Sequence, residues 1–332
     1  MTNWHVRAAE TTDLPALERL LAPGVLVTLP EDESRERWLV AEGVDGVEGP
    51  AGAAGHVQAP QLVACLRLRT CIGMAEPRPW YHVGCVVHAS KHLKLFHRQT
   101  ILLLGNDHTG AAELADWGWD RATLKMPEQA GLLQLLTRAA LLLLARERLL
   151  PGGELIVELP GVRDAQGQSP FWEGLGRHFY TGDMRQTAQR HGAHWRTLVA
   201  SLLPRQAVYT SFLPAATQAA MAQIDPRAGL LADILAAEGL SYNQHITIDD
   251  GGPVFSAQTA QLPTLMRARS LELGQARTGA SMQTWLVLTD RGVGAGLLRG
   301  HLEGQRLCLA EPRPGWLPSS AARVWAVAQT ED

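Results

Sequence analysis

The stretch ELIVELPGVRDAQGQSPFWEGLGRHFY, residues 154–180, begins with the pattern of a buried strand and ends with the pattern of a helix. Ser169 followed by Pro170 is a typical helix start, because serine caps the first turn and proline fits its first position. Glu158 closes the apolar run, and Arg177 and His178 lie on the predicted helix. A carboxylate at a strand end beside a helix start predicts a polar site at this sheet edge.

The surrounding pattern places this strand in an α+β protein. A long helix is predicted over 128–149, and four β-like runs before it predict an antiparallel meander: 62–72, 80–89, 99–107 and 111–120. The N-terminal part predicts a strand over 4–9, a helix capped by Asp13, and a second helix over 29–44.

The second half repeats the order strand, helix, strand, which suggests a duplication. It predicts a strand over 206–214, two helices over 215–240 and a hairpin-like pair over 244–259. A tail of short strands and glycine turns from 279 predicts a small β subdomain. The predicted domains are therefore 1–204, 205–278 and 279–332.

Composition excludes several classes of protein. Lys+Arg number 30 and Asp+Glu number 33, a net charge of −3, so no global basic field is available to hold nucleic acid. The most apolar segment, 135–150, is interrupted by Arg138 and Arg146 and is too short to cross a bilayer. Four cysteines without metal or redox spacing, and no signal-peptide pattern, predict a cytoplasmic location. The histidines near residue 90 have no acidic partners at ligand spacing, so no metal site is expected.

Four further motifs carry a family resemblance. WYHVGCVVHASKHLKLF (80–96), GNDHTGAAEL (105–114), ELPGVRDAQGQSPFWEGLGRHFY (158–180) and ITIDDGGP (246–253) resemble, in this order, the arginine N-succinyltransferase family. The order of elements resembles acyl-CoA N-acyltransferases of the GNAT type. The resemblance implies a tandem GNAT-like acyltransferase fold with mixed, largely antiparallel sheets and a small C-terminal β subdomain.

The resemblance also implies the reaction. A succinyl group would pass from succinyl-CoA to the α-amino group of L-arginine, or of ornithine, in arginine catabolism. Succinyl-CoA would be the acyl donor, with no metal or prosthetic group, and the chain would form a homo- or hetero-oligomer without nucleic acid or membrane partners.

Site residues follow from the chemistry and the resemblance together. The attacking amine must lose a proton to a nearby carboxylate or histidine, for which Glu158, His178 and Glu113 are the catalytic candidates. The substrate-binding candidates are Asn106, Asp107, Thr109, His88, Arg177, Asp249 and Asp250. The acyl-donor candidates are Leu114, Ala115, Trp117 and Gly131. Structural alternatives remain open: Glu158 could bond the following turn, His178 could be a packed histidine, and Asp249 and Asp250 could serve the Gly-Gly-Pro turn.

One motif departs from the family pattern. GNAT proteins hold the CoA pyrophosphate with a Q/R-x-x-G-x-G/A loop at the start of the long helix. The matching stretch EQAGLL retains Gly131 but has Glu128 and Leu133 at the other key positions. A catalytically weak partner subunit of a heteromeric arginine/ornithine succinyltransferase is therefore an alternative, as is an amino-acid-binding regulatory protein.

Overall fold

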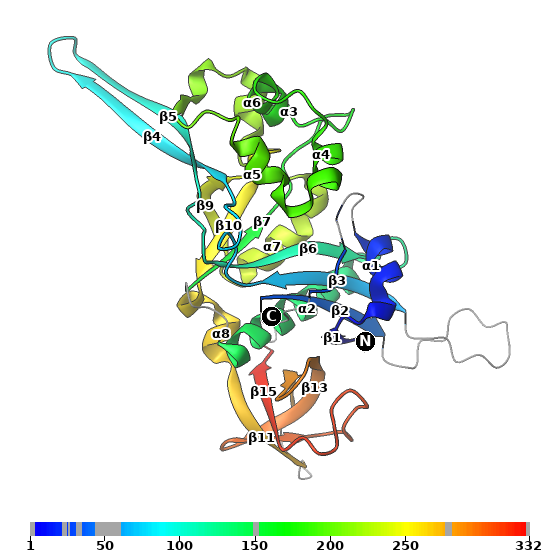
Figure 1. Cartoon of the computed structure of the whole chain (residues 1–332). Helices are drawn as coiled ribbons and strands as arrows, with labels where there is room; N and C mark the ends of the chain where they lie inside the picture. Colours follow the sequence, from blue (N-terminus) through cyan, green and yellow to red (C-terminus); the bar gives the residue numbers. More distant parts are fainter. Residues whose placement is uncertain are drawn as a thin grey trace. The chain divides into compact units, whose positions relative to one another are not determined.

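The chain folds into two compact units, each built from separated segments (Figure 1). The computed structural model describes residues 4–21, 25, 27–30, 35–43, 61–148, 153–275 and 281–329. Unit 1 comprises Met1–Thr70, Leu114–Leu150 and Thr259–Asp332, and unit 2 comprises Cys71–Glu113 and Pro151–Gln258. These units differ from the continuous ranges 1–204, 205–278 and 279–332, which remain a prediction about domains.

Unit 1 combines strands with one long helix. Its strands are β1 (Trp4–Ala8), β2 (Glu36–Gly43), β3 (Leu62–Arg69), most of β6 (Ala112–Trp119), β11 (Arg269–Gln275), β12 (Gln283–Thr289), β13 (Gly294–Glu303), β14 (Arg306–Leu309) and β15 (Arg323–Ala328). Its helices are α1 (Leu14–Leu20), α2 (Met126–Glu147) and α8 (Pro263–Arg267), with short 3-10 turns η1 (Thr11–Asp13) and η6 (Thr259–Gln261).

Five strands at the end of unit 1 close into a small barrel. Their order is β12-β15-β11-β14-β13, and β12 also pairs with β13. Trp285, Val287 and Leu307 belong to the buried cluster of this barrel. The predicted C-terminal β subdomain is thus a closed barrel that also includes β11.

The long helix α2 packs against β2 and β3 in the rest of unit 1. The strands follow in the order β13-β1-β2-β3-β6, with β1 pairing antiparallel to both β13 and β2. Leu132, Leu136 and Leu143 of α2 are fully buried. None of the described helices is both long and apolar enough to span a bilayer.

Unit 2 is a second mixed sheet with short helices. Its strands are the start of β6, β4 (Trp80–Ser90), β5 (Leu95–Gly105), β7 (Glu154–Glu158), β8 (Val208–Tyr209), β9 (Ser241–Ile246) and β10 (Pro253–Gln258). Its helices are α3 (Pro170–Gly174), α4 (Met184–His191), α5 (Trp195–Ala200), α6 (Ala215–Ala220) and α7 (Gly229–Ala237). The 3-10 turns are η2 (Gly176–His178), η3 (Gly192–His194), η4 (Thr210–Phe212) and η5 (Pro226–Ala228).

The sheet of unit 2 runs in the order β6-β7-β10-β9-β4-β5-β8. Only the β6–β7 pair is parallel among these described strands, which agrees with the predicted mixed, largely antiparallel α+β class. Tyr81 and Leu102 of the sheet belong to one buried cluster with Phe171 of α3 and Val199 of α5. Ser169 caps α3 as predicted, since its hydroxyl accepts a hydrogen bond from the N–H of Trp172 at 3.1 Å.

Three sequence predictions about local structure are wrong. The described part of the predicted helix over 29–44 is strand β2, because its short apolar run is buried on both faces and periodicity cannot separate such a run from a helix. The four-strand meander is absent from the described sheets: β4 and β5 form a hairpin, whereas β3 lies between β2 and β6. The predicted strand over 206–214 is reduced to β8, followed by a 3-10 turn.

Candidate active site

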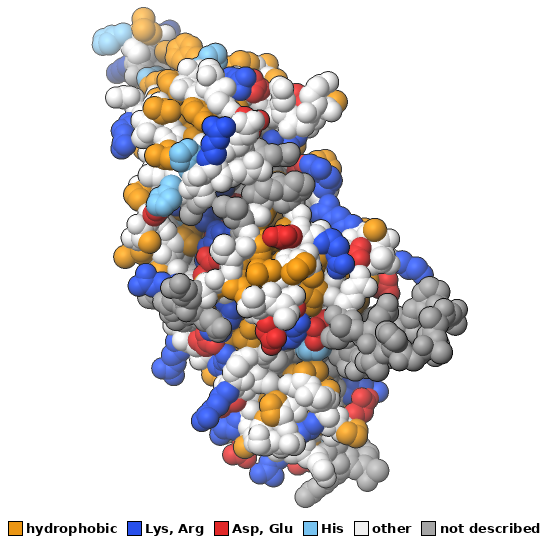
Figure 2. Space-filling view, turned by 45° about the vertical axis from the view of Figure 1, so that its right-hand side comes forward, with side chains coloured by type: hydrophobic (Ala, Val, Ile, Leu, Met, Phe, Trp, Pro, Cys, Tyr) orange, Lys and Arg blue, Asp and Glu red, His pale blue; other side chains and the backbone are white. Residues whose placement is uncertain are grey.

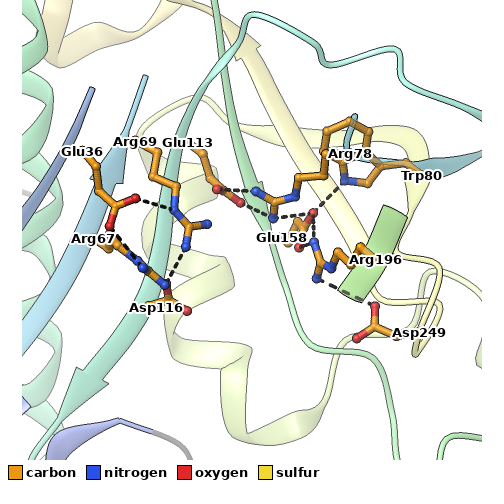
Figure 3. Close-up of polar contacts among 10 residues, drawn as sticks. All are labelled: Glu36, Arg67, Arg69, Arg78, Trp80, Glu113, Asp116, Glu158, Arg196 and Asp249. Atoms are coloured by element: carbon orange, nitrogen blue, oxygen red, sulfur yellow. Dashed lines mark hydrogen bonds and ion pairs between the residues drawn. The ribbon is translucent and has the colours of Figure 1, made fainter. Parts of the chain in front are cut away.

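Glu158, the last residue of β7, lies at the centre of a network of buried charges in unit 2 (Figure 3). Its carboxylate accepts hydrogen bonds from the indole N–H of Trp80 at 2.7 Å and from Nη1 of Arg196 at 2.8 and 2.9 Å. Nη2 of Arg78 lies 2.8 Å from the same carboxylate. Pairing of Glu158 with Val254 of β10 fixes the backbone from which the side chain projects.

Arg78 connects this carboxylate to a second one. Nη1 and Nη2 of Arg78 bind both oxygens of Glu113 at 2.6 and 2.7 Å, the bidentate geometry that makes arginine–carboxylate pairs strong. The side chain of Glu113 is only 1% exposed. Burial by itself lowers the pKa of Arg78, but the charges of Glu113 and Glu158 outweigh burial and raise it. The geometry therefore favours a charged Arg78 at neutral pH.

The electrostatics of Glu158 make it a poor proton acceptor. Burial alone would raise its pKa, but the charges of Arg196 and Arg78, together with the hydrogen bonds to Glu158, lower the pKa to about 2. A carboxylate this acidic, with three donors already bound, is well suited to hold two guanidinium groups in place. It is much less suited to abstract a proton near pH 7.

Asp249 occupies the other end of the network and behaves differently. It lies in the turn after β9, with its Oδ1 atom 3.8 Å from Nη2 of Arg196 and without a hydrogen-bond partner among the described residues. Burial raises the pKa of Asp249 to about 6. The positive charge of Arg196 opposes this increase, whereas the negative charges of Asp250 and Glu158 add to it. Asp249 can thus exchange a proton in the physiological pH range.

Asp250, the neighbouring acid, has a structural role. Its Oδ1 atom accepts hydrogen bonds from the hydroxyl of Thr247 at 2.7 Å and from the N–H of Gly252 at 2.9 Å. These bonds hold the Gly-Gly-Pro turn. The two predicted acids thus have different surroundings: Asp249 belongs to the charge network, and Asp250 holds the turn.

A group of histidines lies on the other side of Trp80. The ring of His108 meets the Trp80 ring edge-on at 5.1 Å, and His245 lies 4.5 Å from His108 and 4.9 Å from His82 between ring centroids. Each of the two central rings contacts a carboxylate: Nδ1 of His108 lies 3.1 Å from Glu154, and Nε2 of His245 lies 2.9 Å from Asp107. Carboxylate–histidine pairs of this kind fix the orientation of an imidazole ring.

Trp80 therefore joins two groups with different chemistry. Its indole N–H binds the Glu158 network, and its ring packs on the histidine group. The network offers fixed positive charge and one titratable carboxylate, whereas the histidine group offers imidazoles paired with acids. Together they provide what an acid–base reaction of an amine requires.

The remaining predicted substrate residues lie outside the network. Asn106 and Thr109 form one turn, in which the Thr109 hydroxyl donates to the Asn106 carbonyl at 2.7 Å. Arg177 lies 4.0 Å from Glu173 at the surface, and His178 is exposed on η2, a separate turn from α3. His88 is exposed on the β4–β5 hairpin, where its ring stacks on Tyr209. Their predicted roles stay predictions.

Asp164, the second acid of the 154–180 stretch, bonds its own turn. Its Oδ1 atom accepts from the N–H groups of Gln166 and Gln168 at 2.9 and 2.8 Å. A surface pocket of about 530 Å³ adjoins this turn, but its lining contains no residue of the charge network. The pocket is therefore not the candidate site.

The predicted acyl-donor strand is β6. It pairs with β7 at Ala112–Leu155 and Glu113–Ile156 before it continues in unit 1. Asp116 has a φ of +49°, a left-handed conformation within the strand, between Ala115 and Trp117. Leu114 is fully buried, and the indole nitrogen of Trp117 is buried without a hydrogen-bond partner among the described residues.

A side chain of the first turn, that of Glu128, caps the start of α2. The Glu128 carboxylate accepts a hydrogen bond from the N–H of Lys125 at 2.9 Å, which completes a capping box. Gly131 is exposed one turn further on. Leu133 is fully buried in the core, so its side chain does not stand over the helix start. The acid, rather than the leucine, is what opposes an anion here.

Sequence reasoning missed the partners of its own candidates. Arg78, Trp80 and Arg196 hold Glu158, and His245 holds Asp107, yet none of the four was a candidate. Arg78 lies between two prolines just before β4, a position that fixes its backbone and was a usable signal. Nothing local marks Arg196, which lies 38 residues from Glu158 in the chain.

One group among the described residues has the composition of a metal site. Ligand atoms of His301, Glu303 and Cys308 in the barrel of unit 1 lie within 4.8 Å of one another. Nε2 of His301 is hydrogen-bonded to Glu303 at 2.9 Å. The group belongs to unit 1, whereas the acid–base residues belong to unit 2, and the amine chemistry above does not use it.

Comparison with known proteins gives consistent matches. A family model described as arginine N-succinyltransferase beta subunit matches residues 4–264. Arginine N-succinyltransferase subunit beta of Pseudomonas aeruginosa is 32% identical over 292 residues, 85% of this chain and 84% of that protein. Arginine N-succinyltransferase of Escherichia fergusonii is 28% identical over 280 residues, 81% of this chain and 80% of that protein.

A solved structure has the same fold over the whole length. The arginine/ornithine succinyltransferase subunit AI from Pseudomonas aeruginosa superposes with a TM-score of 0.76 at 24% identity. The match covers 99% of both chains. The mixed α+β architecture is thus shared with that protein.

Proposed function

Because the chain belongs to the arginine N-succinyltransferase family, we propose that it transfers the succinyl group of succinyl-CoA to the α-amino group of L-arginine, with ornithine as a second candidate acceptor. The chain is accordingly an acyltransferase of arginine catabolism. The observation that carries the site assignment is the buried network that ends in Asp249, a carboxylate with a pKa of about 6.

The alternative of a catalytically weak partner subunit is not favoured. The Escherichia fergusonii relative and several Salmonella relatives carry the name of the enzyme without a subunit label. The network and the histidine group also supply the acid–base groups that the reaction requires.

Asp249 is the group to which we assign the proton of the attacking amine. An α-ammonium group that enters beside Asp249 would find a carboxylate with an oxygen free of hydrogen bonds to the described residues and a pKa close to neutral. Glu158 and Glu113 support this step as positioning residues, because they fix Arg78 and Arg196. The free amine then attacks the thioester carbonyl. The tetrahedral adduct loses its remaining surplus N–H proton as it collapses to the amide and CoA thiolate; this proton is the one that the thiolate receives, and Asp249 returns its own proton to solvent.

His245 is the group to which we assign protonation of the thiolate. Nε2 of His245 lies 2.9 Å from Asp107, and this contact fixes the orientation of the ring. The predicted catalytic role of His178 has no such support from its surroundings.

For the acyl donor, we propose contact of pantetheine with β6 at Leu114, Ala115 and Trp117. The left-handed Asp116 supports this, since a residue in that conformation within a strand turns backbone groups out of the regular ladder. The same feature, together with the order β6-α2-β7, supports the proposed tandem GNAT-like organisation. A cytoplasmic location and an oligomeric state are also proposals, the first supported by four free cysteines.

The test is succinyl transfer by the purified full chain. Release of CoA from succinyl-CoA is followed with a thiol reagent, with L-arginine, ornithine or no acceptor, and mass spectrometry identifies the N-succinyl product. Asp249→Asn is expected to lower kcat/KM at least about 100-fold, the usual effect of losing a general base. Asp164→Asn is the matched control, because Asp164 bonds its own turn, away from the network. Absence of acceptor-dependent CoA release by the wild type would contradict the proposed function.

A further inference from the structure

The distal part of the β4–β5 hairpin, residues 85–100, is a two-stranded ribbon that we call the arm (Figure 1). β9 pairs with β4 only at Tyr81 and His82, and β8 pairs with β5 only at Ile101 and Leu102. Along the arm itself, neither edge has a partner strand among the residues that the structure describes. The arm therefore presents two open edges.

One face of the arm continues the apolar face of the core. Tyr81, Val83, Leu102 and Leu104 share one side of the hairpin and pack in or against the buried cluster of unit 2. Alternation places Cys85, Val87, Ala89 and Phe96 on the same side of the arm, together with Thr100 and Arg98, the cross-strand partners of Cys85 and Val87. Helices α3 and α5 contribute to the cluster at the near end, but Val87 is 50% and Phe96 70% exposed. The apolar face thus extends beyond the layer that covers it.

A ribbon of this kind is expected to be covered by another part of a protein. An isolated two-stranded hairpin is marginally stable in water, and an open apolar edge recruits other chains. The apolar part of a sheet face is normally buried against a second layer of helices or strands. In the described part of unit 2 that layer ends before Cys85.

Charge indicates what the covering layer is. β4, β5 and the turn between them hold Lys91, Lys94 and Arg98 and no acidic residue, so the rest of the chain has 27 basic against 33 acidic residues, a net charge of −6. Two arms would repel each other, whereas an arm and the remainder of another copy would attract. The upper left of Figure 2, where the arm ends, shows hydrophobic, histidine and basic side chains with little acid among them.

The distribution of apolar side chains argues against a lipid surface. The turn at the end of the arm holds Lys91 and Lys94 on either side of one exposed leucine, Leu93, while Val87 and Phe96 lie along its side. A membrane-inserting hairpin needs several apolar residues at the tip, whereas this tip has a single one between two lysines. Side-on packing against a protein surface fits this arrangement better.

We propose that the arm packs its apolar face on the body of a second copy of this chain, and that reciprocal exchange of arms forms a two-fold symmetric dimer. Such an interface is isologous: the same arm and the same acceptor surface occur twice. The contact needs no residue of the Glu158 network, so the test of the dimer does not depend on the proposed reaction.

Sedimentation velocity of the full chain tests the proposal. The wild type is expected to sediment as a dimer at micromolar concentration, and the double variant Val87→Asp, Phe96→Asp to dissociate at least about 100-fold more readily. The matched control is Leu95→Asp, a leucine on the opposite face of the arm that is 50% exposed and should leave the dimer intact. High salt should weaken the wild-type dimer, because part of the attraction is between charges.

A second measurement avoids any dependence on variants. Cys85 is exposed in the single chain, whereas Cys65 and Cys308 are buried, so thiol labelling quantified by peptide mapping should show protection of Cys85 that rises with protein concentration. A monomeric wild type, a dimer unaffected by the double variant, or a Cys85 labelling rate independent of concentration would each overturn the proposal. Binding of the monomer to anionic lipid vesicles, lost in the double variant, would overturn it in favour of a lipid surface.

Discussion

Replacing Asp249 with asparagine should increase stability and remove activity at the same time. Burial raises the pKa of Asp249 from its ordinary value of 3.8 to about 6. Each pKa unit corresponds to about 1.4 kcal/mol, so the ionised carboxylate lowers the free energy of unfolding by about 3 kcal/mol at pH 7. The asparagine side chain carries no charge and would avoid this cost, while Arg196 keeps both hydrogen bonds to Glu158.

The pH dependence gives the sign of the effect. Because the folded pKa lies above the unfolded one, the cost of the wild-type carboxylate is full above about pH 6 and disappears as the pH falls below about 4. Urea unfolding of wild type and Asp249→Asn should therefore differ by about 3 kcal/mol at pH 7 and by little at about pH 4. In parallel, kcat/KM should fall at least about 100-fold and its acidic limb near pH 6 should vanish.

A variant of the neighbouring acid shows whether the stabilisation is specific to Asp249 or follows from the loss of either acid in the turn. Asp250→Ala removes the acceptor for Thr247 and Gly252 and should destabilise by about 1–3 kcal/mol. If Asp249→Asn were also destabilising at pH 7, or if its kcat/KM were unchanged, the reasoning about Asp249 would be refuted.

Three further substitutions probe other parts of the chain. Glu158→Gln should destabilise by about 3–5 kcal/mol in urea, since Arg196 loses its closest counter-charge and Arg78 keeps only Glu113. In the wild type this contribution is lost as the pH falls from 4.5 towards about 2, and equal stability of variant and wild type would contradict the network. Glu128→Gln keeps an acceptor for the Lys125 N–H but removes the negative charge at the start of α2, and should tighten CoA up to about tenfold by calorimetry. An unchanged CoA affinity would place the phosphates elsewhere. Gly252→Ala would bring a Cβ within 2.1 Å of the Leu159 carbonyl and should lower the melting temperature markedly, whereas an unchanged melting curve would show that the turn can move.

Sequence patterns predicted the elements whose signals are local. The strand that ends at Glu158 and the helix start at Ser169 were found because alternation, capping and proline placement act over a few residues. Strand β2 was mistaken for a helix because Trp38 to Ala41 is a short apolar run, and only its burial on both faces of a sheet decides its conformation.

The same distinction between local and long-range signals explains which site residues could be predicted. Glu158, Glu113 and Asp249 were found because they stand in motifs at strand ends, yet their chemistry depends on Arg78 and Arg196, which lie 35 and 38 residues from the acids they pair with. A carboxylate that binds two guanidinium groups closely and one that has a single guanidinium group at 3.8 Å look alike in sequence. Their pKa values are lowered to about 2 for Glu158 and raised to about 6 for Asp249, and only tertiary structure makes this difference.

The pairing of β1 with β13 limits how early unit 1 can fold during synthesis of the protein. His5 is opposite Gly296 in the sheet, so the ribosome must add about 290 residues before β1 can meet this neighbour, which takes roughly 15–60 s at about 5–20 residues per second. During that time Val6, fully buried in the finished protein, lacks one side of its final surroundings. Unit 1 cannot be completed vectorially from the N-terminus, and nascent chains released before residue 294 should depend on chaperones and be cleared by proteases.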